Sequence, residues 1–325
     1  MTPQAPDTTP TQPSCRTFDQ AAISVFQVMR SLPRRVMARA SLLAATSLVV
    51  SVGVLVPQVS AQAATYVPPL PRTTATAYVV ADATTGRILA ARDMHGRLAP
   101  ASTLKVLTAL TALPHLAGSD TVKGTYAAAG VDGTKVGINP GQTYTAKQLF
   151  TAMMVMSGND AAMTIGAGLG GLPRAISEMN AMATHLQAHD TVAHTTNGLD
   201  APGQTSSAYD LAMMFRDGLA SSRFRYYIAL RSASFPLAQG KSYTIYTHDR
   251  LLNSYPGMLG GKNGYTIAAN ASYVGAASRN GHTIIVAVMR DVPNFWPEVT
   301  SLLNWGFAAD GHVTTLGYLK SPLRN

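Results

Sequence analysis

The sequence predicts a mixed α/β fold of the α+β type, in which one antiparallel sheet is assembled from both chain ends around an inserted helical subdomain. Strand-like runs lie near the start, at residues 76–93, and again near the end, at residues 271–289. The segments between them carry helical patterns, and strands separated from helices in this way are typical of α+β domains. The 325 residues show no internal repeat and no second composition regime, which favours one large domain.

Residues 1–63 are predicted to be a leader that directs export. Four arginines between Arg30 and Arg39 precede an apolar run from Leu42 to Val56, and Ala61-Gln62-Ala63 forms a small-x-small cleavage signal. The apolar run is shorter than the roughly 20 residues that a membrane span needs. Cleavage is therefore favoured over the alternative, an uncleaved N-terminal membrane anchor.

Three parts are expected after the leader. Residues 64–75 contain three prolines and predict an extended tether, residues 76–310 form the domain, and residues 311–325 form a C-terminal tail. No apolar or amphipathic stretch closes the chain, so no C-terminal membrane anchor is predicted.

The domain is expected to open with a hairpin over residues 76–93, turning at residues 83–86. Apolar periodicity predicts helices at residues 104–113, 149–156, 173–185 and 297–308. A further helix is expected after Ser207, the predicted N-cap of a capping box with Asp210. The dipeptide Asn280-Gly281 predicts the turn of the hairpin over residues 271–289.

Composition excludes several functional classes. Hydrophobic residues make up 46% of the chain and charged residues 13%, as in globular rather than disordered proteins. The one cysteine, Cys15, lies in the leader, so neither disulfides nor thiolate chemistry are predicted for the mature chain. Loss of the five arginines and two aspartates of residues 1–63 changes the net charge from +9 to +6, which favours anionic surroundings such as a cell envelope. No basic run is interleaved with aromatic residues, so no nucleic-acid partner is expected.

No cofactor or metal is predicted. The glycines between Gly166 and Gly171 match a dinucleotide fingerprint in their letters, but they follow a helical stretch instead of a strand. His185, His189 and His194 lack the accompanying carboxylates or HExxH pattern of a zinc site.

Lys105 is the first indication of chemistry, because it lies in an otherwise almost apolar helix. Between Leu104 and Leu113 the only other polar side chains are two threonines. An unpaired ammonium is costly in such surroundings, and Ser102 lies one turn earlier on the same face. Burial lowers the pKa of a lysine, so a neutral Lys105 can accept the Ser102 proton and activate that hydroxyl as a nucleophile. The alternative is a surface lysine whose stem covers apolar neighbours.

Two later segments supply complementary groups. Ser157 offers a hydroxyl that can relay a proton, and Asn159 offers an amide that can bind a peptide group. Lys262, Asn263 and Gly264 come just before a predicted strand, and the glycine there lets a substrate approach the backbone. The order of the three motifs, with 55 and 105 residues between their first members, is more specific than any one of them.

Together the motifs resemble the S-x-x-K, S-x-N and K-T-G set of the penicillin-recognising serine enzymes. Over residues 74–308 the chain more closely resembles the low-molecular-weight penicillin-binding proteins of the serine-type D-alanyl-D-alanine carboxypeptidase family. AYVVADATTGRILAARD, SGNDAA, TTNGLDAPGQTSSAYDLA and NWGF are typical of that family. The resemblance implies a transpeptidase/β-lactamase-like domain, peptidoglycan stem peptides ending in D-Ala-D-Ala as substrates, and β-lactam antibiotics as inhibitors.

The resemblance also implies catalytic roles for residues in this sequence. Ser102 would attack the carbonyl between the two D-alanines to form an acyl-enzyme, with Lys105 as the base. Ser157 would pass the proton to the departing D-alanine. The backbone N–H groups of Ser102 and Tyr265 would form the oxyanion hole.

The substrate-binding roles follow in the same way, with two departures from the family pattern. Asn159 would hold the substrate amide, and Lys262 would attract the terminal carboxylate beside Asn263 and Gly264. Asn263 stands where the family has threonine. Phe295 stands where the family often has an arginine, and Arg290 is the nearest substitute in the sequence.

Three alternatives stay open on the sequence alone. A class A β-lactamase deacylates with a glutamate-positioned water, but the only glutamates, Glu178 and Glu298, lie in predicted helices. A DD-endopeptidase would share the fold. The departures at Asn263 and Phe295 leave open a non-catalytic penicillin-binding scaffold protein.

Overall fold

The computed structural model describes residues 66–323, so the predicted leader lies outside the described residues. Its main feature is a six-stranded antiparallel sheet in the order β10-β2-β1-β9-β8-β7. The strands are β1 (Ala77–Asp82), β2 (Arg87–Arg92), β7 (Met258–Thr266), β8 (Asn270–Arg279), β9 (His282–Asp291) and β10 (Gly317–Tyr318). Because β1 pairs with β2 on one side and β9 on the other, the predicted sheet built from both chain ends is confirmed.

Turn chemistry explains both predicted hairpins. Between β1 and β2 the Asp82 carboxylate accepts the Thr84 N–H at 2.8 Å, and Gly86 has a φ of +78°. Between β8 and β9, Asn280 and Gly281 have φ values of +50° and +83°. Positive φ at both central residues is what a two-residue type I′ turn requires.

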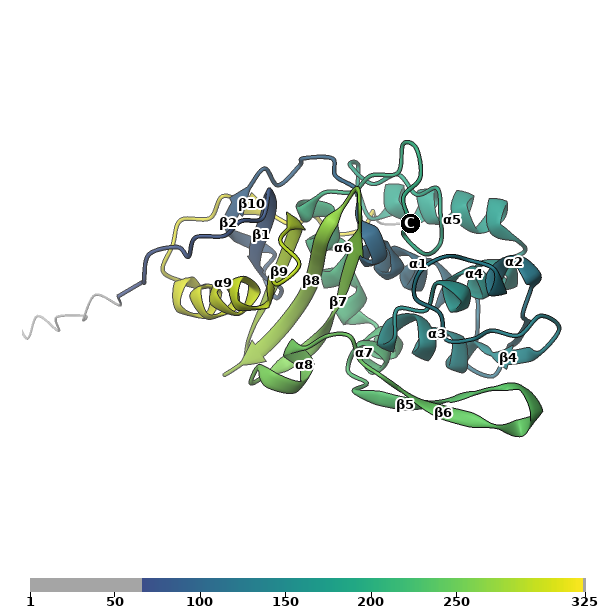
Figure 1. Cartoon of the computed structure of the whole chain (residues 1–325). Coiled ribbons are helices and arrows are strands. Elements are labelled where there is room, and N and C mark those ends of the chain that lie inside the picture. The colour runs from purple at the N-terminus through teal and green to yellow at the C-terminus, as the bar shows by residue number, and fades with distance from the viewer. Residues whose placement is uncertain (1–65, 324–325) are drawn as a thin grey trace, which may run out of the picture. The chain divides into compact units, whose positions relative to one another are not determined.

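The helices lie on both faces of this sheet. The longer ones are α1 (Lys105–Ala112), α3 (Ala146–Val155), α4 (Asn159–Gly168), α5 (Leu172–His185), α6 (Ala208–Ala220) and α9 (Trp296–Ala309). The shorter ones are α2 (Tyr126–Ala129), α7 (Ser222–Ile228), α8 (Leu251–Ser254) and the 3₁₀ turns η1 (Ala101–Leu104) and η2 (Ala238–Gly240). Two small two-stranded sheets, β3 (Thr121–Lys123) with β4 (Thr143–Thr145) and β5 (Ser232–Pro236) with β6 (Ser242–Tyr246), border the helical subdomain (Figure 1).

Strand β1 shows how the sequence builds two hydrophobic cores. Its six residues are all buried. Val79 belongs to the core that joins the sheet to α1 and α6, whereas Val80 belongs to the core under α9. Neighbouring side chains of a strand point to opposite faces, so a strand covered on both sides is apolar throughout. In Figure 1, α9 accordingly covers one face of the sheet and α6 the other.

Two segments expected at the periphery pack against the domain. The segment predicted as a tail contributes β10, which pairs with β2, and the Leu323 N–H reaches the His185 carbonyl at 2.9 Å. The segment predicted as a tether is held by α9: the Trp305 indole donates to the Pro68 carbonyl at 2.9 Å. Hydrogen bonds to backbone groups leave no periodic side-chain pattern, so the sequence did not indicate these contacts.

The predicted capping box at the start of α6 forms only in part. Ser207 Oγ accepts the Asp210 N–H at 3.1 Å, as expected. The Asp210 carboxylate instead accepts the Asp190 N–H at 2.8 Å and the Thr191 hydroxyl at 2.7 Å. The Asp210 carboxylate therefore binds the loop at residues 190–191 instead of the N-cap backbone N–H of Ser207.

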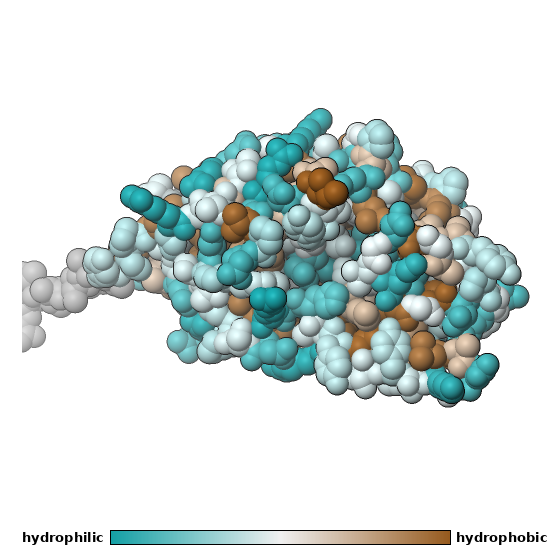
Figure 2. All heavy atoms as spheres, in the orientation of Figure 1, coloured by the Kyte–Doolittle hydropathy of each residue, from teal (hydrophilic) through white to brown (hydrophobic). Residues whose placement is uncertain are grey.

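Figure 2 shows hydrophilic and hydrophobic residues interspersed on the visible face. The most exposed apolar side chains, among them Tyr126 and Ile267, come from different parts of the chain, as is usual for surfaces in contact with water. Within residues 66–323, none of the helices combines the length and the apolar character needed to cross a membrane.

Candidate active site

Lys105 is the first residue of α1, and its fully buried side chain faces Ser102 on the preceding turn η1. Its Nζ lies 2.7 Å from Ser102 Oγ, 2.7 Å from Asn159 Oδ1 and 2.5 Å from the Asn197 carbonyl oxygen. The two amide oxygens can only accept hydrogen bonds. A neutral amine can donate its two hydrogens to them and keep its lone pair for the Ser102 proton.

The electrostatic surroundings favour this neutral form. Burial lowers the pKa of Lys105 well below its ordinary value, and the nearby charge of Lys262 lowers it further, while Asp160 opposes the shift. A lysine with a lowered pKa can serve as a general base near neutral pH. The predicted burial of Lys105 is thus confirmed, and the surface-lysine alternative is wrong.

Ser157 and Asn159 lie where α3 ends and α4 begins. Ser157 has a φ of +62°, a strained conformation for a residue with a side chain, and such strain often accompanies function. The Asn159 amide bridges two partners, since Oδ1 contacts Lys105 and Nδ2 donates to the Asp132 carbonyl at 2.8 Å. The sequence did not predict this contact between Asn159 and Lys105. With these two bonds made, one of the two Nδ2 hydrogens of Asn159 remains for a ligand.

Asp160 joins the start of α4 to the loop at residues 136–138, a role that the sequence analysis did not identify. Its fully buried carboxylate accepts backbone N–H groups of the neighbouring loop at 2.8–3.0 Å and of its own helix at 2.9 Å. The donors are Val136, Gly137, Ile138 and Ala161. An aspartate directly after a Ser-x-Asn motif at a helix start was the available signal.

Asp160→Asn is expected to destabilise the fold by on the order of 2 kcal/mol or more, because one carboxylate oxygen becomes an NH₂ group that faces buried N–H donors. Asp120→Asn is a matched control, since exposed Asp120 accepts a single N–H, from Ala117 at 2.7 Å, and should cost less than about 1 kcal/mol. Urea unfolding of both variants measures the difference. Equal losses in the two variants would contradict the anchoring role.

The edge strand β7 brings the third motif to the nucleophile. Lys262 is buried, its Nζ donates to the Asn263 carbonyl at 2.6 Å, and burial lowers its pKa to about 7, against the opposing effect of Asp249. A Cβ on Gly264 would lie only 2.5 Å from the Ser102 nitrogen, so only glycine permits this approach. Asn263 and the 58%-exposed Tyr265 point to the opposite face of the strand from Lys262.

A loop at residues 195–200 completes the site and was not singled out as part of it. Asn197 supplies the carbonyl that accepts from Lys105. Gly198 has a φ of +82°, and a Cβ there would lie 2.0 Å from the Ala101 carbonyl oxygen. Asp200 accepts the Thr266 hydroxyl at 2.6 Å. The loop therefore joins the nucleophile turn to the far end of β7.

Phe295 stands where the family often has an arginine, and Arg290 is the nearest substitute in the sequence. Phe295 is buried, with its ring 5.7 Å from Tyr273 and 4.3 Å from Trp296. Arg290 donates to the Ala268 carbonyl at 3.3 Å. Arg290 stays the nearest substitute cation in the sequence, with one guanidinium N–H engaged by that carbonyl.

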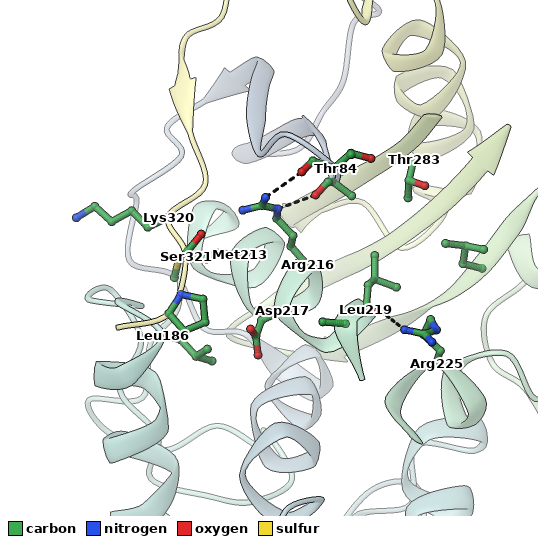
Figure 3. A pocket seen from close by; sticks show the side chains of 14 residues that line it. Thr84, Leu186, Met213, Arg216, Asp217, Leu219, Arg225, Thr283, Lys320 and Ser321 are labelled. Atoms are coloured by element: carbon green, nitrogen blue, oxygen red, sulfur yellow. Dashed lines mark hydrogen bonds between the residues drawn. The ribbon is translucent and has the colours of Figure 1, made fainter. Parts of the chain in front are cut away.

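A cavity of about 530 Å³ lies elsewhere, between the β1–β2 turn, α6 and the C-terminal segment (Figure 3). Arg216 donates there to the carbonyls of Ala83 at 2.6 Å and Thr84 at 3.2 Å. These bonds satisfy backbone carbonyls of the β1–β2 turn, so Arg216 stabilises that turn. Ser102 is not among the residues that line this cavity.

Comparison with known proteins places this arrangement in a family. A family model described as D-alanyl-D-alanine carboxypeptidase matches residues 62–292. The D-alanyl-D-alanine carboxypeptidase DacB2 of Mycobacterium tuberculosis is 41% identical over 247 residues, which cover 74% of this chain and 84% of that protein. DacF of Bacillus subtilis is 28% identical, and the match covers 71% of this chain but only 61% of DacF.

Solved structures agree with the sequence comparisons. A D-alanyl-D-alanine carboxypeptidase from Mycobacterium tuberculosis superimposes with a TM-score of 0.72 and 40% identity, covering 79% of this chain and 97% of that one. The Streptomyces K15 DD-transpeptidase superimposes with a TM-score of 0.70 and 26% identity, covering 73% and 98%.

The fold is an antiparallel sheet with inserted helices, and a serine and a buried lysine lie next to its edge strand β7. These features define a serine enzyme of the penicillin-binding DD-peptidase class. The chain belongs to the D-alanyl-D-alanine carboxypeptidase family. The predicted fold and family are thereby confirmed.

Proposed function

We propose that the protein is an exported serine-type D-Ala-D-Ala carboxypeptidase that trims peptidoglycan stem peptides through an acyl-enzyme on Ser102. The observation that carries this proposal is the 2.7 Å contact between Ser102 Oγ and the buried Nζ of Lys105. Family membership supplies the substrate class, because relatives bear the name D-alanyl-D-alanine carboxypeptidase. Export rests on the basic and apolar pattern of residues 1–63.

In the acylation step, Lys105 takes the proton of Ser102 while Oγ attacks the carbonyl between the D-alanines. The developing oxyanion is held by the backbone N–H groups of Ser102 and Tyr265. Ser157 passes a proton to the nitrogen of the departing D-alanine as the C–N bond breaks. Water then hydrolyses the ester and restores the Ser102 hydroxyl.

The remaining site residues position these groups. Asn159 orients Lys105 through Oδ1 and offers its second Nδ2 hydrogen to the substrate amide. Lys262 adds positive potential beside Lys105, which lowers the Lys105 pKa. Asn263 and Gly264 border the substrate, since the absence of a side chain on Gly264 lets the strand lie against the Ser102 backbone.

Two measurements test the proposal. Incubation of mature protein with benzylpenicillin, followed by peptide mapping, is expected to place the adduct on Ser102, and Ser102→Ala should prevent it. Incubation with an acyl-D-Ala-D-Ala peptide is expected to release D-alanine. An adduct on another residue would overturn the mechanism, and acylation without any D-alanine release would favour the non-catalytic scaffold or an endopeptidase.

The positions of the two glutamates favour a long-lived penicilloyl-enzyme over a β-lactamase. Glu178 pairs with Arg174 at 2.8 Å on α5, and Glu298 on α9 accepts the Thr74 N–H at 2.8 Å. Both carboxylates are thus engaged on helices outside the group formed by Ser102 and Lys105. Rapid catalytic hydrolysis of nitrocefin would contradict this interpretation.

A further inference from the structure

The β5–β6 hairpin lies along α3, and none of the three motifs lies on it (Figure 1). The half-buried Tyr243 of β6 donates its hydroxyl proton to the Val136 carbonyl at 2.9 Å. The same hydroxyl oxygen lies 3.8 Å from the Sδ atom of Met156, which directly precedes Ser157. One hydroxyl therefore contacts both the loop at residues 132–138 and the residue next to Ser157.

The loop at residues 132–138 is also bound to the start of α4. Asn159 donates its backbone N–H to the Thr134 carbonyl at 2.8 Å, and its Nδ2 donates to the Asp132 carbonyl at 2.8 Å. The Asp160 carboxylate accepts three successive backbone N–H groups of the same loop. The position of Asn159 is therefore tied to the position of this loop.

The peptide group between Val136 and Gly137 is bound on both sides. Its carbonyl accepts from Tyr243, and its N–H donates to the Asp160 carboxylate at 2.8 Å. Hydrogen bonds in such a chain polarise and strengthen one another. Val136 is buried, and in the described part of the chain no other group donates to its carbonyl. Loss of the Tyr243 hydroxyl would therefore leave a buried acceptor without a partner.

The surroundings of Tyr243 keep its hydroxyl oriented and protonated. Its ring packs edge-on against Phe235 with 6.3 Å between the ring centres, and Phe235 stacks on Tyr144 at 5.7 Å. Burial raises the pKa of Tyr243, and the negative charge of Asp160 raises it further. The hydroxyl therefore remains a hydrogen-bond donor throughout the neutral range.

We propose that Tyr243 is a positioning residue, which holds the loop at residues 132–138 so that Asn159 stays in place against Lys105. This inference rests on the proposed function and deepens it, because Asn159 Oδ1 accepts from the Lys105 Nζ at 2.7 Å. Small displacements of catalytic groups are enough to slow a reaction. Because Tyr243 reaches Lys105 through the loop, its loss should slow the acylation step more than it weakens ligand binding.

The test compares acylation by benzylpenicillin in wild type and in Tyr243→Phe, which removes the hydroxyl and keeps the packed ring. The first-order rate constant at saturating penicillin should fall about 3–10-fold, the kinetic equivalent of one neutral hydrogen bond. The penicillin concentration that gives half the maximal rate should change by less than about 2-fold. Amide hydrogen exchange in the loop at residues 132–138 should become faster, because the loop opens more readily.

Tyr209→Phe is the matched control. The Tyr209 hydroxyl also donates to a backbone carbonyl, that of Tyr318 at 3.0 Å, but this bond lies at β10, at the opposite edge of the sheet from β7. Both variants should lower the melting temperature. Only Tyr243→Phe should slow acylation and speed up hydrogen exchange in the loop at residues 132–138.

The outcomes separate this inference from the proposed function. Wild-type protein that is acylated on Ser102, together with a folded Tyr243→Phe variant that is acylated equally fast, overturns the role of Tyr243 alone. Equal slowing in Tyr209→Phe also overturns it, since the loss would then follow general stability. Slower acylation without faster exchange in the loop contradicts the route through Val136. Wild-type protein that forms no adduct on Ser102 overturns the proposed function, and the inference about Tyr243 with it.

Discussion

Lys105→Arg is expected to reduce the acylation rate of Ser102 by penicillin by at least about 10²–10⁴-fold, the usual contribution of a general base. Arginine keeps the positive charge but cannot lose a proton at any pH that the protein tolerates. It would also place a larger, permanently charged group among Ser102, Asn159 and the Asn197 carbonyl, where the wild-type lysine is fully buried.

Intact-mass measurement of acylation over time gives the rate constant for wild type and variant. Lys147→Arg is the matched control, because it makes the same substitution on the exposed surface of α3 and should acylate at the wild-type rate. Wild-type acylation should increase as the pH rises through the lowered pKa of Lys105, since the neutral fraction increases in that direction. Near-normal acylation by a folded Lys105→Arg variant would show that Lys105 is not the base.

Gly198→Ala is expected to reduce acylation by about 10²-fold and to lower the thermal stability. Its Cβ would lie 2.0 Å from the Ala101 carbonyl oxygen, so either the nucleophile turn or the loop must move. The loop also carries the Asn197 carbonyl that accepts from Lys105. A displacement of about 1 Å in a catalytic group is enough for a loss of this size.

Gly141→Ala separates steric displacement from backbone strain. Gly141 has the same φ of +82°, but a Cβ there would meet nothing within 4 Å. Both variants should lose roughly 1–2 kcal/mol of stability from the left-handed conformation, whereas only Gly198→Ala should lose acylation. Equal acylation by the two variants would refute the steric argument. Rate constants with penicillin and melting temperatures are measured on both.

The two hairpins of the sheet, β1 with β2 and β8 with β9, could be predicted because their determinants are local in sequence, whereas the glycine-rich strand β7 was not expected as a strand. The apolar run of β1, the Asn280-Gly281 turn and the helix from Leu172 to His185 each depend on residues within a few positions of one another. The added strand β10 could not be predicted, since two residues pairing through backbone groups carry no pattern. The second partner of Asp210 likewise lies 20 residues away along the chain.

The sequence by itself determined the family and the pairing of Ser102 with Lys105, because one helical turn separates the two residues and burial of a lysine is visible in its apolar neighbours. Only the tertiary structure decided which other atoms surround them. The Asn197 carbonyl comes from a loop and the Asp160 carboxylate from the first turn of α4, and the two lie far apart in the sequence. Backbone carbonyls have no residue type, and a cavity is formed only when distant segments pack together, so neither can be read from spacing.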